Sequence, residues 1–228
     1  KKIIVSFVIS SLSLLGTEPK VISLDKIEHR NKSGSLLVYI KNQDTPFTGK
    51  AVSFYANGQK KKELTYKDGK CDGLSSWWFQ NGQKSVERNY RDGKYDGLVN
   101  FWYENGQKKS EVNYKNGQHH GLWTKWYENG QCKETGNFIE GWPHEHKIGW
   151  YDNGQTRDEV YYMGGLMGSA IVWKPGGERC PVTNAKAGSG VMVGYNQEGR
   201  EFARFTYKEG GLTHRGLSSP PSPCPPQP

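Results

Sequence analysis

The chain has 228 residues, a hydrophobic fraction of 34%, an aromatic fraction of 13% and a formal net charge of +8. This hydrophobic fraction is lean for one compact core, and no nucleophile elbow, Walker loop, HExxH or GxGxxG motif is present. We therefore expect neither an enzyme nor a cofactor. The basic residues are scattered apart from Lys60, Lys61 and Lys62, so we expect no nucleic-acid partner.

The N-terminus combines Lys1 and Lys2 with the apolar stretch IIVSFVISSLSLLG. A basic start before a short apolar segment is typical of a secretory signal, which we predict over residues 1–16, with a leader segment over 17–36. The alternative is a buried first strand. The stretch is too short to span a bilayer as a helix, and no other segment is suited to it. A functional signal predicts a secreted, periplasmic or cell-envelope protein, and otherwise a cytoplasmic one.

The dipeptide Asn-Gly begins at residues 57, 81, 105, 129 and 153, with a spacing of 24 residues each time. An unvaried period indicates one small structural unit that is copied end to end. Asn-Gly is also typical of a two-residue hairpin turn, in which both residues take φ > 0. The spacing therefore predicts a row of β-hairpins.

The clearest unit, DGKYDGLVNFWYENGQKKSEVNY, covers residues 92–114. Its segments LVNFWYE and QKKSEVNY are short and rich in aromatic and β-branched residues, so we predict two strands joined by the tight Asn-Gly turn. Gly93 and Gly97 predict a wider turn between units. We expect about seven units over residues 37–212, the outer ones degenerate. The segment SLLVYIK is expected to cap the array, and residues 213–228 to form a disordered, proline-rich tail.

Aromatic residues recur with the same period and form columns across the predicted sheet. Because Trp102 and Tyr103 are adjacent in one strand, they point to opposite faces, so both faces carry rings. A third column on the return strand contains Tyr66, Tyr90, Tyr114, Phe138 and Tyr162. The candidate binding residues are Trp78, Trp102, Trp126, Trp150, Tyr103, Tyr127 and Tyr151.

Lysines follow the Asn-Gly turns and are expected to gather along one edge of the sheet. Such an edge would attract an anionic membrane surface. A column of glutamates is expected to form a solvated face that pairs with basic residues. The lysines are Lys60, Lys61, Lys62, Lys84, Lys108, Lys109 and Lys133, and the glutamates are Glu63, Glu87, Glu111 and Glu159.

Three histidines, His120, His144 and His146, are expected near neighbouring wide turns. Imidazoles so placed are weak candidates to bind Zn²⁺ or Cu²⁺, or to titrate near neutral pH. The simpler interpretation is that they replace the turn residues Asp72 and Asp96, so we predict no metal site. The cysteines at 71, 132, 180 and 224 have no CxxC spacing and are expected to be free thiols.

The unit of residues 92–114 resembles the MORN repeat, and more closely the bacterial variant with a YxNGQ turn, which is often labelled the antitoxin part of a toxin–antitoxin system. This resemblance implies an all-β, elongated, single-layer antiparallel sheet of tandem hairpins. It also implies a scaffold that binds a protein partner. The alternatives are peripheral binding to anionic lipid through the basic edge, and binding to cell wall or carbohydrate.

Overall fold

The computed structural model describes residues 20–217. The predicted signal peptide, the start of the leader, Cys224 and residues 218–228 lie outside the described residues. The strands and the single 3-10 helix are β1 (Val21–Ser23), η1 (Leu24–Lys26), β2 (Ile27–Lys32), β3 (Ser35–Ile40), β4 (Gly49–Phe54), β5 (Lys60–Lys67), β6 (Lys70–Cys71), β7 (Gly73–Trp78), β8 (Lys84–Arg91), β9 (Lys94–Trp102), β10 (Lys108–Lys115), β11 (Gln118–Trp126), β12 (Cys132–Ile139), β13 (Trp142–Trp150), β14 (Thr156–Met163), β15 (Leu166–Val172), β16 (Gly190–Tyr195), β17 (Glu201–Lys208) and β18 (Gly211–Leu217).

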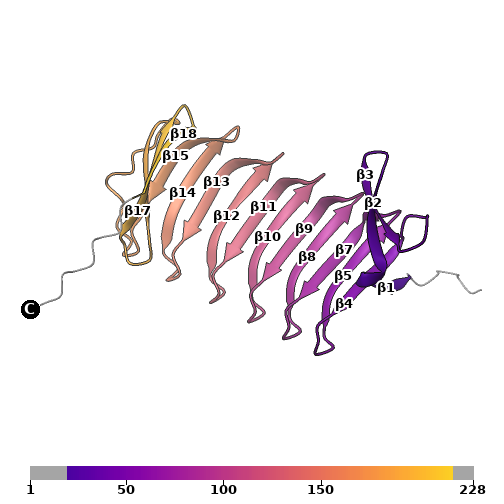
Figure 1. Ribbon diagram of the computed structural model, residues 1–228. Coiled ribbons are helices and arrows are strands. Elements are labelled where there is room, and N and C mark those ends of the chain that lie inside the picture. Colours follow the sequence, from indigo (N-terminus) through magenta and orange to yellow (C-terminus); the bar gives the residue numbers. More distant parts are fainter. Residues whose placement is uncertain (1–19, 218–228) are drawn as a thin grey trace, which may run out of the picture.

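One 13-stranded sheet forms most of the structure, in the order β1-β4-β5-β7 and then consecutively to β15, with β6 paired to β5. Every neighbouring pair is antiparallel except β1 and β4. The sheet stays open and runs as a row of hairpins (Figure 1). The predicted fold class, an all-β antiparallel sheet of tandem hairpins, is confirmed.

The two-residue hairpin turns lie at the sites where we expected the wider turns. Asp92 and Gly93 have φ values of 51° and 82°, and the flanking residues Arg91 and Lys94 are paired. Positive φ at both central residues is the property of a type I′ turn, whose twist matches that of the strands. Equivalent turns occur at residues 68–69, 116–117 and 140–141.

The Asn-Gly sites instead form longer loops, which corrects our expectation. At residues 103–107 the Tyr103 N–H donates to the Gln107 carbonyl at 2.9 Å, and the Gly106 N–H donates to the Tyr103 carbonyl at 3.0 Å. Gly106 has a φ of 85°, whereas Asn105 does not adopt a positive φ. The Asn105 Oδ1 accepts the Gln107 N–H at 3.0 Å and holds the loop. A type I turn followed by a left-handed glycine is the common three-residue hairpin loop.

Cross-strand neighbours point to the same side of a sheet, so the registers define its two faces. The tyrosine face carries Tyr66, Tyr90 and Tyr114. The glutamate face carries Glu63, Glu87 and Glu111, which are linked across the strands by Ser76 and Asn100. Each face has its own rows of side chains with the period of the repeat.

The tyrosine face is covered at both ends of the array. At the first end Val38 of the β2–β3 hairpin, and Phe47 from the segment between β3 and β4, pack against Ala51 and Tyr66. At the other end β16, β17 and β18 form a separate three-stranded sheet, the C-terminal sheet, which packs on β14 and β15. Figure 1 shows these two additions at opposite ends of the row.

Three details differ from the expected ribbon. The last predicted hairpin leaves the main sheet and folds over it, because residues 173–189 separate β15 from β16. The expected capping segment is β3, which pairs with β2 instead of extending the array. Strand β18 continues to Leu217, so residues 213–217 of the expected tail belong to a strand.

Candidate functional site

A row of exposed leucines crosses the glutamate face. Leu74, Leu98 and Leu122 are 47%, 38% and 61% exposed. Each follows a glycine with positive φ (Gly73, Gly97 or Gly121), where the strand bulges before pairing resumes. Their cross-strand neighbours are Asn89, Asn113 and Asn137. The sequence contains this signal as a Gly-Leu pair every 24 residues.

The leucine row continues into apolar side chains at two type I′ turns. Ile139 pairs with Trp142, and Met163 pairs with Leu166. Trp142 and Met163 are 66% and 64% exposed. A Cβ built on Gly165 would lie 3.0 Å from Cε3 of Trp142, so the two turns are in contact. Because Ile139 follows Phe138 of the tyrosine face, these side chains alternate onto the glutamate face.

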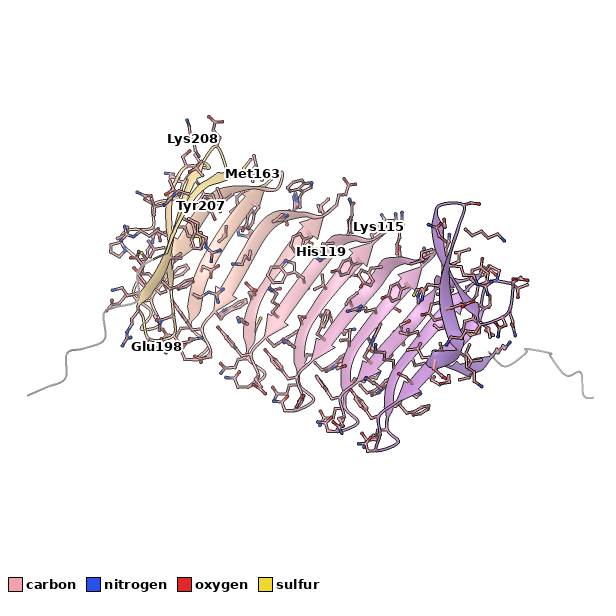
Figure 2. The ribbon with its side chains drawn as sticks, in the orientation of Figure 1. Lys115, His119, Met163, Glu198, Tyr207 and Lys208 are labelled. Carbon is pink, nitrogen blue, oxygen red and sulfur yellow. The ribbon has the colours of Figure 1, made fainter. Side chains whose placement is uncertain are left out.

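The earlier turns are polar at the same positions. They carry Lys67 with Lys70, Arg91 with Lys94, and Lys115 with Gln118. Figure 2 shows Lys115 and Met163 along the same edge of the sheet. We call the apolar set the leucine–tryptophan strip, which consists of Leu74, Leu98, Leu122, Ile139, Trp142, Met163 and Leu166.

The predicted tryptophan column lies on the glutamate face, near the Asn-Gly loops. Trp78, Trp102, Trp126 and Trp150 are all half-buried. The Lys60 Nζ lies 5.1 Å above the Trp78 ring and 2.6 Å from the Glu63 carboxylate. Hydrogen bonds from Lys50 and Lys60 lower the pKa of Glu63. Near the Asn-Gly loops, the glutamate face therefore carries tryptophan rings that lie beneath lysine–glutamate ion pairs.

The predicted tyrosines connect one repeat to the next. The hydroxyls of Tyr103 and Tyr127 donate to the Trp126 and Trp150 carbonyls, both at 2.8 Å. Tyr151 donates in the same way to the Trp173 carbonyl at 2.7 Å. Tyr151 is 1% exposed, and burial raises its pKa to about 12. These bonds give the tyrosine column a structural role.

The predicted basic edge divides between the two faces. Lys84 and Lys108 form ion pairs with the glutamates three residues later, Glu87 and Glu111, as Lys60 does with Glu63. The next lysines along the chain instead lie over tyrosine rings, at 5.2–5.4 Å, and Lys62 lies across from Trp77. The ring pairs are Lys61 with Tyr55, Lys109 with Tyr103, and Lys133 with Tyr127. Adjacent residues of a strand point to opposite sides, so the lysines do not form one cationic surface.

Rings pack against each other in the middle of the tyrosine face. Tyr95 lies 4.9 Å from Tyr90 and 5.1 Å from Tyr114, measured between ring centroids. The row continues through His119, which is 4.6 Å from Tyr114 and is labelled in Figure 2. Val99 beneath is only 2% exposed. This row supplies much of the burial that a thin sheet otherwise lacks.

The histidine candidates are dispersed. The His144 Nε2 lies 3.8 Å from Glu145, and the His146 ring packs 5.0 Å from Tyr161. Within residues 20–217 no group of three His, Cys, Asp or Glu side chains could hold a metal ion. Cys71, Cys132 and Cys180 are free thiols. In the same part of the chain no helix is long and apolar enough to cross a membrane.

These features define the class of protein as an open tandem-repeat β-sheet. Four segments of the chain match the MORN repeat variant, over residues 47–68, 72–92, 95–116 and 120–140. MORN repeats are generally non-catalytic scaffolds that bind proteins or membranes. The resemblance to this repeat is confirmed for those segments, whereas the antitoxin label gains no support. No curated protein matches the chain.

Proposed function

We propose that this chain is a non-enzymatic repeat scaffold that binds a protein partner on its glutamate face. The observation that supports this is the leucine–tryptophan strip, in which large apolar side chains 38–66% exposed lie on one side of the sheet. Large exposed apolar side chains that gather on one face of a protein mark a candidate binding site. The strip provides the apolar centre of an interface, and the asparagines beside it provide a polar margin.

The charges on this face favour a protein over a membrane. Glu63, Glu87 and Glu111 share the face with the strip and with the basic residues of the earlier turns. The face is therefore mixed in sign and is not a uniformly cationic surface for anionic headgroups. Six of the seven lysines expected to attract lipid are paired with these glutamates or lie over tyrosines, and Lys62 lies across from Trp77. Peripheral membrane binding remains the alternative proposal. Vesicle sedimentation with and without anionic lipid tests it.

Carbohydrate binding needs ring faces that a sugar can stack on. Lys60 and Lys108 already lie over the rings of Trp78 and Trp126, at 5.1 and 5.9 Å. This arrangement favours a protein partner over a glycan. Neutralising a toxin would be one form of protein binding, and nothing in the matched repeats specifies it.

Photo-crosslinking in the native cell tests the proposed face. A photoreactive residue replaces Leu98 or Leu122 in the strip, with Leu36 as the control, because Leu36 is 66% exposed but lies in the β2–β3 hairpin. We expect one discrete protein adduct from both strip positions and none from Leu36. The substitution Leu122→Asp should abolish the adduct formed at position 98. Equal labelling at all three positions, or no adduct from the strip, would contradict the proposal.

A further inference from the structure

A cavity of about 370 Å³ lies between the tyrosine face and the C-terminal sheet. Its apolar walls include Val160 and Val172 from β14 and β15, and Met192 and Phe205 from β16 and β17. This volume is within the usual range for small-molecule sites, about 300–1,000 Å³. The cavity is on the side of the sheet opposite the leucine–tryptophan strip.

One end of the cavity is charged. Asp158, 3% exposed, accepts from the Lys147 Nζ at 2.8 Å and from the Arg157 Nε at 2.6 Å. Glu134 lies farther away, at 3.8 Å from Lys147 and 3.7 Å from Arg157, and is held by Lys125 at 2.7 Å. The wall of the cavity therefore carries two cations and one carboxylate, Lys147, Arg157 and Asp158.

The cations keep hydrogen-bond donors that no described residue uses. An ammonium has three N–H groups and a guanidinium has five. Lys147 donates one hydrogen bond and Arg157 also donates one, both to Asp158. Their side chains are only 23% and 21% exposed, so water satisfies these donors less well than at the surface. An anionic acceptor in the cavity would complete the network.

The protonation states keep this end of the cavity positive. Burial raises the pKa of Asp158, but the nearby Lys147 and Arg157 outweigh it and the net shift is downward. For Arg157 burial lowers the pKa, and the charge of Asp158 more than restores it. Asp158 and Arg157 are therefore charged near neutral pH. Together with Lys125 and Glu134, the network holds three basic and two acidic side chains.

Two phenols also line the cavity, Tyr162 of β14 and Tyr207 of β17, the latter labelled in Figure 2. Among the described residues neither hydroxyl has a hydrogen-bond partner. Burial raises the pKa of both, so they remain protonated and can donate. Their rings, with Phe205, are flat surfaces on which an aromatic ligand can pack.

We propose that this cavity binds a small aromatic carboxylate. The carboxylate accepts hydrogen bonds from Lys147 and Arg157, and the ring packs between the main sheet and the aromatic side chains of β17. The proposal is independent of the partner on the glutamate face, because the two sites lie on opposite sides of the sheet.

Calorimetric titration of the full chain with naphthoate, and with uncharged naphthalenemethanol, tests the charge requirement. We expect saturable one-to-one binding of naphthoate, and binding of the alcohol about tenfold weaker or less. Lys147→Met should weaken naphthoate binding by about tenfold or more. Lys125→Met is the matched control, because Lys125 also pairs with Glu134 but does not line the cavity. It should leave the affinity within about twofold.

Thermal unfolding of each variant without ligand establishes that it folds. If Lys147→Met does not fold, Tyr207→Phe replaces it, since this change removes one donor and keeps the ring. It should weaken naphthoate binding by about fivefold. Absence of saturable binding at millimolar naphthoate, equal affinity for the alcohol, or equal losses in the lysine variants would each overturn the proposal.

Discussion

At the scale of single residues, side chains at the Asn-Gly loops join neighbouring repeats. The Asn105 Nδ2 donates to the Glu128 carbonyl of the next loop at 3.0 Å, while its Oδ1 holds its own loop. Tyr103 donates its hydroxyl to the Trp126 carbonyl. The same two contacts recur along the array with the period of the sequence. A thin sheet is thereby held in register by bonds between side chain and backbone.

The array contains a natural test of the tyrosine contact, because Phe79 stands where the other repeats have Tyr. Tyr103→Phe should lower the free energy of unfolding by about 1 kcal/mol, since a half-buried carbonyl loses its donor. The reverse change, Phe79→Tyr, should raise it by up to about 1 kcal/mol by donating to the equivalent Trp102 carbonyl. Urea unfolding measures both. Destabilisation by Phe79→Tyr would show that the hydroxyl does not fit this repeat.

At the scale of elements, two of the type I′ turns are also held by an aspartate of the preceding repeat. The Asp92 N–H donates to the Asp72 Oδ2 at 2.9 Å, and the Asn116 N–H donates to the Asp96 Oδ2 at 3.3 Å. The next position in this column is His120, and no equivalent bond to the Glu140 turn is formed among the described residues. His120 therefore interrupts the column of aspartate contacts.

Restoring the acceptor should strengthen this turn. We expect His120→Asp to raise the free energy of unfolding by about 0.5–1 kcal/mol, through a hydrogen bond to the Glu140 N–H. His120→Ala is the control, because it removes the imidazole without adding an acceptor. Urea unfolding of both variants, with hydrogen exchange at Glu140, measures the effect. Equal stability of the two variants would contradict the proposed bond.

At the scale of the whole molecule, residues 20–217 cover both ends of the tyrosine face and leave the glutamate face open. The hairpin β2–β3 buries Ala51 and Tyr66, and the C-terminal sheet buries Val160 and Val172. Terminal repeats lack a neighbour on one side, so covering them removes apolar surface that would otherwise meet water. Below the second cover lies the ion network around Asp158.

Asp158 should contribute to stability in a pH-dependent way. Its native pKa is below the usual 3.8, so its contribution is present above that value and is lost as the pH falls through the native pKa. Near neutral pH we expect Asp158→Asn to cost about 3 kcal/mol, because Lys147 and Arg157 lose their partner. The difference from the wild type should shrink as the pH falls below 3.8 toward the lowered native pKa of Asp158. Urea unfolding across this range tests it, and a constant difference would mean that the charge of Asp158 does not act.

The local features could be predicted from the sequence. Period, strand positions and the hairpin unit follow from turn residues and alternating side chains, which depend on neighbours in the chain. The alternation of side chains along each strand also predicts that the tryptophan column lies on one face of the sheet. The leucine row was missed, although Leu98 precedes the buried Val99 and alternation alone places it on the exposed side.

The repeat period, the strands and the columns of side chains were determined by the sequence itself, because each depends on short-range geometry. Only the tertiary structure decided which glycine turn is the tight one, since bulges at residues such as Gly97 reset the register between strands. Packing between distant segments decided which face of the sheet is covered. The alternation of side chains along the strand placed Lys60 and Lys61 on opposite faces. The cavity follows from long-range contacts between the main sheet and the C-terminal sheet, which no local pattern encodes.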